Sequence, residues 1–237
     1  MVFFPLSLVA LSLFLGRYMI PPKQILQILG NQFLGFHFEP TWTISAETVI
    51  LQVRLPRAVM AGLVGAGLSM SGAAFQGMFQ NPLVSPFILG VSSGASFGAA
   101  LGLVLELPAL AVQGLAFIFG ILAVVIAYFL AHIYKATPIL MLVLSGMVVS
   151  TFFQALLSII KFVADDEEKL PAITFWLMGS LGSIEVKDLA IAVIPISLAI
   201  VVLFLLRWKL NVLSMGDRES RSRSEEHTSE LQSRQSI

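Results

Sequence analysis

Long apolar runs, separated by short polar breaks, make up most of this chain. A helix that crosses the hydrocarbon core of a membrane needs about 20 predominantly apolar residues. All runs but the first come close to that length or exceed it, so we predict an all-α, polytopic transmembrane helical bundle. The expected crossings are residues 2–15, 57–79, 88–105, 109–133, 139–163 and 189–206. Because the first run is short, we expect its beginning to lie upstream of this reading frame.

Small residues recur at every fourth position in the second and third runs, which places them on one face of a helix. A glycine costs a water-soluble helix up to about 1 kcal/mol relative to alanine, whereas in lipid small residues four apart let two backbones approach closely. We therefore predict tightly packed helices, with the lining of a transport path as the open alternative. The residues are Ala61, Gly65, Ser69, Ala73 and Gly77 in the second run, and Gly90, Gly94, Gly98 and Gly102 in the third.

The polar segments between the runs carry further signals. Residues 18–53 form a mixed connection whose aromatic side chains suit a membrane–water interface. The acidic run at residues 165–168 is expected to be a solvated loop, and a short amphipathic piece follows at residues 171–181. The fifth crossing carries a stripe of uncharged polar residues, namely Ser145, Ser150, Thr151, Gln154 and Ser158.

Composition narrows the function classes. Of 237 residues, 57% are hydrophobic and 12% are charged, and the mean hydropathy is +0.90, which is far from ordinary globular usage. A formal net charge of zero argues against a nucleic-acid surface, and the absence of cysteine removes disulfides and thiolate metal sites. No charged residue lies in the middle of a crossing, which disfavours a proton-coupled carrier. His37, His132 and His227 are scattered without a metal-binding spacing, so we expect neither a metal nor a cofactor.

Several short motifs, in this order, resemble one transporter family. They read RLPR at residues 54–57, NPLVSP at 81–86, LGVSSGA at 89–95, WLMGS at 176–180 and LNVLSMGD at 210–217. Over residues 15–222 the chain is similar to the FecCD (BtuC-like) permease subunits of binding-protein-dependent ABC importers for iron-siderophores, haem and vitamin B12. The resemblance implies about six of the family's ten helices, placed as a multi-pass protein in a bacterial-type cytoplasmic membrane.

The same resemblance implies partners. The chain would pair with a second permease copy, identical or related, and bind a cytoplasmic ABC ATPase and an extracytoplasmic substrate-binding protein. ATP is then hydrolysed by the ATPase, so the chain itself is not expected to be an enzyme. Membrane lipid surrounds it, and no nucleic acid is expected. Iron-siderophore-type chelates are the expected cargo, with haem and cobalamin as open alternatives.

Two of the motifs carry the candidate sites. In the family resemblance, Arg54 and Arg57 face outward and receive acidic residues of the docking binding protein, because a planar guanidinium pairs well with a carboxylate. The open alternative is that both only anchor a helix end at the membrane surface. The other motif resembles the coupling segment, a short helix-turn-helix that seats in a groove of the ATPase, and a plain juxtamembrane helix is its alternative. Its residues are Leu210, Asn211, Leu213, Ser214, Met215, Gly216 and Asp217, with the turn at Gly216.

These signals divide the chain into three parts. Residues 1–209 form the transmembrane domain, residues 210–222 a truncated coupling segment, and residues 223–237 a polar tail with no family counterpart. The tail resembles the conceptual translation of a sequencing adapter, so we expect it to be non-native, and a natural disordered tail is the alternative. By the family topology, the loop at Lys135 is cytoplasmic and Lys169 lies outside. At the start of the third run, Ser92 and Ser93 are expected to cap backbone N–H groups.

Two other function classes stay open. A secondary transporter or channel would need coupling charges or inverted repeats, and neither is visible in the sequence. A structural membrane scaffold would give no reason for residues 210–217 to fit an ATPase groove. Co-purification with an ATPase subunit separates all three classes.

Overall fold

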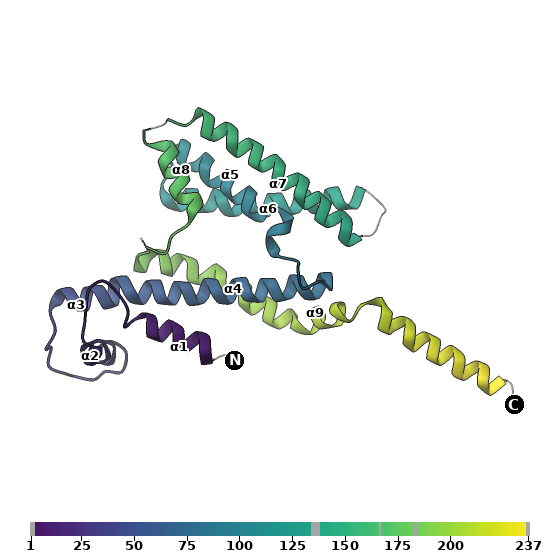
Figure 1. The fold of residues 1–237 in the computed structure, drawn as a ribbon, viewed down its shortest axis with the longest axis horizontal. Coiled ribbons are helices and arrows are strands. Elements are labelled where there is room, and N and C mark those ends of the chain that lie inside the picture. The colour runs from purple at the N-terminus through teal and green to yellow at the C-terminus, as the bar shows by residue number, and fades with distance from the viewer. Residues whose placement is uncertain (1–2, 134–137, 166, 183, 236–237) are drawn as a thin grey trace. The chain divides into compact units, whose positions relative to one another are not determined.

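Helices account for all regular structure in the part of the chain that the computed structural model describes, which is residues 3–133, 138–165, 167–182 and 184–235. Side chains are described for residues 4–133, 140–165, 167–182 and 184–211. The predicted all-α fold is confirmed. Figure 1 shows the elements along the chain. They are α1 (Phe3–Ser12), α2 (Pro22–Phe33), α3 (Ile44–Thr48), the π-helix η1 (Val49–Arg54), α4 (Leu55–Phe79), the 3-10 helix η2 (Pro86–Leu89), α5 (Val91–Val104), α6 (Ala109–Ile133), α7 (Pro138–Val163), α8 (Lys169–Met178) and α9 (Val186–Gln235).

Four helical segments among these residues are long and apolar enough to cross a membrane. They are Ile44–Phe79, Ala109–Ile133, Leu140–Val163 and Val186–Asn211. The first and third predicted runs form shorter apolar helices. α1 has 10 residues and α5 has 14, so at about 1.5 Å per residue each is shorter than roughly 30 Å of hydrocarbon.

The described chain forms two compact units, and the first consists of residues 1–71 and 181–206. In this unit α2, α3 and η1 form a small cap with its own apolar core. Ile25 and Ile28 of α2 pack against Ala46 of α3 and Ile50 of η1, and none of the four is more than 3% exposed. The sequence predicted a mixed connection here and did not predict the short amphipathic helix α2, which starts at the second residue of the pair Pro21-Pro22.

The first long span begins earlier than predicted. Helical backbone starts at Ile44, where the Thr43 side chain caps the helix by accepting a hydrogen bond from Ala46 N at 3.2 Å. It continues without a break to Phe79, so the predicted start at residue 57 is wrong. The π-helical turn in its middle has a local cause. Pro56 has no N–H to offer the carbonyl four residues earlier, and the Leu55 N–H bonds to Ile50 O, one residue further back than in an α-helix.

The second unit consists of residues 72–180 and 207–237, and α5, α6 and α7 pack together in it (Figure 1). Gly94, Gly98 and Gly102 of α5 are buried. A β carbon built on Gly98 would stand 2.5 Å from Leu115 O of α6. The two backbones therefore approach so closely at this point that a larger residue has no room.

An aromatic cluster joins all three helices of this unit. Phe97 of α5, Phe119 of α6 and Phe153 of α7 have ring centroids 5.0 to 6.4 Å apart, in tilted or edge-on arrangements. Such arrangements place the positive edge of one ring against the negative face of another. Phe153 and its neighbour Val149 are each only 2% exposed, so the cluster forms the apolar centre of the unit.

Gly90 separates η2 from α5 and has a different role from the other glycines of the series. Its φ of +81° lies in the left-handed region, which glycine adopts without steric cost. α5 therefore begins only after Gly90, and the predicted helix over residues 88–105 starts too early. Ser85 stands at the N-cap of η2, where its Oγ accepts a hydrogen bond from Phe87 N at 3.4 Å.

Lys169, at the start of α8, binds the turn that follows the C-terminal end of α5. Its Nζ lies 2.8 Å from Glu106 Oε1 and donates to Val104 O at 3.1 Å. α8 begins at Lys169 and ends at Gly179, whose φ of +68° again suits glycine. The turn after α5 and the start of α8 therefore lie together at one end of the unit.

α9 runs as one helix from Val186 to Gln235. The helix-turn-helix that the sequence predicts at residues 210–217 is not the local structure, because the backbone stays helical through Gly216. A glycine inside a helix costs only about 1 kcal/mol, and the neighbouring leucine, methionine, arginine and glutamate residues favour helix. The predicted domain boundaries after residues 209 and 222 both fall within this helix.

Candidate functional site

Arg54 and Arg57 lie where the first long span meets the cap. Residues 58–79 contain no charged side chain, and as a helix they extend about 33 Å, enough for the roughly 30 Å of hydrocarbon. In the other direction, the helix continues through η1 and α3 into the cap. The π-helical turn ends at Arg54, and turns of this kind occur often at functional sites.

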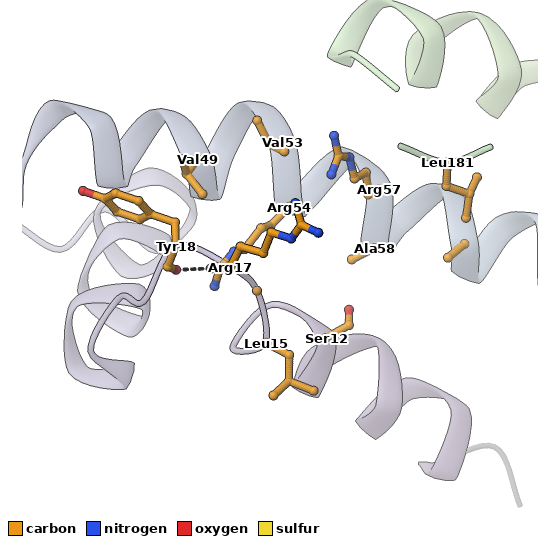
Figure 2. Close-up of a pocket in the computed structure, with 12 residues that line it drawn as sticks. Ser12, Leu15, Arg17, Tyr18, Val49, Val53, Arg54, Arg57, Ala58 and Leu181 are labelled. Carbon is orange, nitrogen blue, oxygen red and sulfur yellow. Dashed lines mark hydrogen bonds between the residues drawn. The ribbon is translucent and has the colours of Figure 1, made fainter. Parts of the chain in front are cut away.

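Both guanidinium groups are hydrogen-bonded to backbone carbonyls of their own unit. Arg54 Nη1 donates to Leu13 O at 2.8 Å and its Nη2 donates to Tyr18 O, the contact drawn as a dashed line in Figure 2. Arg57 Nη2 donates to Gly182 O. A guanidinium has five N–H donors. Both arginines therefore keep donors for a further acceptor, and Arg57 Nε is buried without an acceptor among the described residues.

The two arginines line one cavity of about 490 Å³, shown in Figure 2. Arg17 joins them, and none of the described lining residues is acidic. The rest of the lining is mainly apolar and comprises Ser12, Leu15, Gly16, Tyr18, Val49, Val53, Ala58, Ala61 and Leu181. A second cavity of about 540 Å³ shares Arg57 and adds Glu185 and Lys187. An excess of positive charge around a concave surface attracts carboxylates and other anions.

An uncharged polar face on α7 is the second candidate site. Thr151, Gln154 and Ser158 are exposed and recur three and four residues apart, so they share one face of the helix. Each hydroxyl donates to a carbonyl of its own helix, at 2.9 Å for Thr151 and 3.0 Å for Ser158. Gln154 Nε2 reaches Ser93 Oγ of α5 at 3.5 Å. Polar side chains on a membrane span face a bundle interior or a water-filled cavity rather than lipid.

The two predicted small-residue faces have different surroundings. Gly94, Gly98 and Gly102 lie buried against α6. On α4, by contrast, Ala61, Gly65, Ser69 and Ala73 are exposed and Gly77 is half-buried. A β carbon built on Gly65 would meet nothing within 4 Å. In the first unit α4 instead turns other glycines toward its neighbours. A β carbon on Gly62 would lie 3.5 Å from Val9 of α1, and one on Gly67 would lie 3.6 Å from Ile196 of α9.

Two other sequence predictions have separate outcomes. The caps expected at Ser92 and Ser93 are wrong, because α5 takes Gly90 as its N-cap without a side-chain bond and both serines lie inside the first turn. Of the predicted coupling residues, Leu210 is half-buried and Asn211 is exposed. The side chains of Leu213, Ser214, Met215, Gly216 and Asp217 lie outside the described residues.

Sequence reasoning missed a second close approach. Gly146 of α7 is buried beneath η2, and a β carbon there would clash with Ile88 O and stand 3.0 Å from Leu89 Cα. The four-residue spacing of Gly146 and Ser150 was a usable signal for it. The Lys169–Glu106 pair had no such signal, because its members are far apart in the sequence.

Comparison with known proteins gives a consistent result. The model of the FecCD transport family matches residues 4–223. The molybdate import system permease protein MolB of Haemophilus influenzae is 39% identical over 214 residues, which covers 90% of this chain and 62% of that protein. The hemin transport system permease protein HmuU of Yersinia pestis is 30% identical over 209 residues, with 83% and 62% covered. The chain thus spans about three fifths of the length of these relatives.

A solved structure shares the fold as well. It is described as a metal-chelate type ABC transporter in an inward-facing conformation, and it superposes with a TM-score of 0.76 at 34% sequence identity. The match covers 94% of this chain and 66% of that one. The apolar spans, the RLPR motif at the edge of the first span and the match over nearly the whole chain lead to one assignment: this chain belongs to the FecCD transport family.

Proposed function

We propose that this chain is the permease subunit of an ABC importer whose cargo is a metal chelate. The observation that carries the proposal is the structural match to a metal-chelate type ABC transporter over 94% of the chain. Relatives named for molybdate and for hemin indicate that cargo differs between members. Iron-siderophore-type chelates are our first candidate.

The exposed polar face of α7 is the proposed wall of the transport path. Thr151, Gln154 and Ser158 offer an amide and hydroxyls, and none of them carries a charge. Both hydroxyls already donate to carbonyls of their own helix, so the face presents weak hydrogen-bonding capacity rather than a tight site. Such a wall lets a bulky polar chelate pass without holding it, which a transport path requires.

The arginine cavities are the proposed docking site of the substrate-binding protein. Arg57 lines both cavities at the edge of the cap and retains N–H donors. An acidic side chain of a docking protein would find a planar bidentate partner there. Lys187 on the second cavity adds positive charge nearby. Steering by such rim charges acts mainly on the association rate and its dependence on salt.

The cytoplasmic side completes the proposed assembly. Residues 210–217 of α9 are the proposed contact with an ABC ATPase, which supplies the energy by hydrolysing ATP. A second permease copy, identical or related, forms the other wall of the path. In this arrangement the permease itself catalyses no reaction.

The test is transport by the full-length gene product, expressed with an ABC ATPase and a binding protein encoded beside it. The host strain lacks its own siderophore permease. We expect uptake of radiolabelled ferric siderophore that stops when the ATPase carries a substituted Walker lysine. Uptake of molybdate, haem or cobalamin in place of the siderophore would keep the importer and change the cargo. Uptake that persists with the disabled ATPase would contradict the importer itself.

A further inference from the structure

The chain after α1 lies against the membrane-edge end of the first long span, and Arg54 makes the contact. Its guanidinium donates to the carbonyls of Leu13 and Tyr18, which stand on either side of the connection that leaves α1. Figure 2 shows the Arg54 side chain reaching this connection from the helix. The contact joins residues 41 and 36 positions apart in the sequence.

Gly16, between those two carbonyls, makes room for the guanidinium. A β carbon built on Gly16 would stand 2.5, 2.8 and 2.9 Å from Nη2, Cζ and Nε of Arg54. Real β carbons essentially never approach other atoms so closely, so any larger residue at this position displaces the arginine. The glycine and the guanidinium therefore fit each other as a pair.

The connection needs such a donor. A helix leaves its last carbonyls without intrahelical partners. After α1, a tight 3-10 turn satisfies the carbonyls of Ala10, Leu11 and Ser12, and the carbonyls of Leu13 and Tyr18 lie beyond that turn. Near a membrane, unpaired carbonyls are more costly than in water. A charged, planar donor that spans two carbonyls satisfies both with one side chain.

We propose that Arg54 is a positioning residue, which clamps residues 13–18 onto the span and thereby fixes one wall of the arginine cavity. Its neighbour Arg57 has a different task. It holds the segment at Gly182 by one bond and keeps its remaining donors for an acidic partner. The role proposed for Arg54 does not depend on whether the chain is an importer, because it concerns only contacts inside the first unit.

Hydrogen exchange of the full chain in detergent, read by mass spectrometry, tests the clamp. We expect Arg54→Met to speed exchange in residues 13–20 about tenfold, the factor typical of losing a charge-assisted hydrogen bond. Gly16→Ala should speed exchange in the same residues by a smaller factor, since the guanidinium is the flexible end of its side chain and can shift without being removed. The double variant should exchange no faster than Arg54→Met alone. Arg54→Lys should lie between, because one ammonium replaces the planar fork poorly.

Arg57→Met is the matched control. It should leave residues 13–20 at the wild-type rate and speed exchange only around Gly182. Unchanged protection of α2 and α3, which form the cap core of the same unit, would show that each variant is still folded. The clamp is refuted if residues 13–20 exchange alike in wild type and Arg54→Met, or if Arg57→Met loosens them equally. Additive effects of Gly16→Ala and Arg54→Met would refute the proposed pairing of the two.

Discussion

The Lys169–Glu106 ion pair shows how an exposed contact responds to pH. The hydrogen bond and the charge of Lys169 lower the pKa of Glu106, and the hydrogen bond from Glu106 raises the pKa of Lys169 against the effect of desolvation. Because the pKa of Glu106 is lowered, its charged form stabilises the fold at pH values above the ordinary carboxyl pKa of 4.5, and this stabilisation is lost as the pH falls through the lowered pKa. Because the pKa of Lys169 is raised, its charged form stabilises the fold at pH values below the ordinary lysine pKa of 10.5, and this stabilisation is lost as the pH rises through the raised pKa.

We therefore expect Glu106→Gln to lower the melting temperature of the detergent-solubilised chain at pH 7 by no more than about 2 °C, because exposed pairs contribute little. The difference from wild type should disappear at a pH below the lowered Glu106 pKa, where the carboxyl is neutral in both states. High salt at pH 7 should shrink it as well. A difference that is equal at both pH values would show that the amide disturbs the turn for another reason.

Arg57 provides a residue-scale test of docking. In the complete transporter, Arg57→Gln should weaken capture of the binding protein about tenfold at low salt and less at high salt, since the lost contact is electrostatic. Surface plasmon resonance on nanodiscs measures both conditions. Lys23→Gln is the control, because Lys23 is an exposed cation of the same cap that lines neither arginine cavity. Equal affinity of the Arg57 variant and wild type would remove Arg57 from the docking site.

At the scale of elements, α5 and α6 are held both by close backbone approach at the glycines of α5 and by the contact of Phe97 with Phe119. Gly94 lies against Phe119 of α6, Gly98 against Leu115 O and Gly102 against Val112. Three successive turns of α5 therefore contact α6 closely. On the α6 side, the buried alanines Ala116 and Ala123 lie among larger residues such as Leu115. Small residues on both helices maximise the close contact area that drives association in lipid.

Gly98→Leu should destabilise the second unit by about 1 to 3 kcal/mol or more, because the added side chain has no space without moving a helix. Gly114→Leu on α6 is the matched control, since a β carbon there meets nothing within 4 Å. Thermal unfolding and protease resistance in detergent compare the two. If both leucines are tolerated equally, the α5–α6 approach is looser than described.

The sequence predicted α6 and α7 well, and it missed the early start of the first long span and the full length of α9. α6 and α7 were located almost to the residue, because each is an uninterrupted apolar run between polar or proline-bearing breaks. The cap was missed because its core rests on a few residues such as Ile25 and Ile50, whose contact arises only after folding. Gly90 and Gly94 belong to the same four-residue glycine series, but Gly90 forms a left-handed turn and Gly94 packs against α6. Only tertiary structure decides between these two roles. For the arginines, spacing brought Arg54 and Arg57 to one cavity, but the carbonyls that bind them lie far away in the chain.

At the scale of the whole molecule, the absence of cysteine makes orientation directly measurable. A single cysteine at Leu107, in the turn joined to Lys169, should react with a membrane-impermeant maleimide in intact cells. One at His132, at the far end of α6, should react only after the membrane is opened. The family topology is the reason, because it places Lys169 outside and the loop at Lys135 in the cytoplasm. The reverse labelling pattern would invert the orientation.

The π-helical turn at residues 49–54 has a mechanical consequence. The continuous helix Ile44–Phe79 has 36 residues and is a rod about 54 Å long. A helix bends most easily where its regular hydrogen-bond pattern is interrupted, and the π-helical turn with Pro56 close after it is such a place. We therefore expect a force on the cap to bend the helix first beside Arg54. The stiffness of this joint decides how much of a push at the surface reaches the apolar part of the rod.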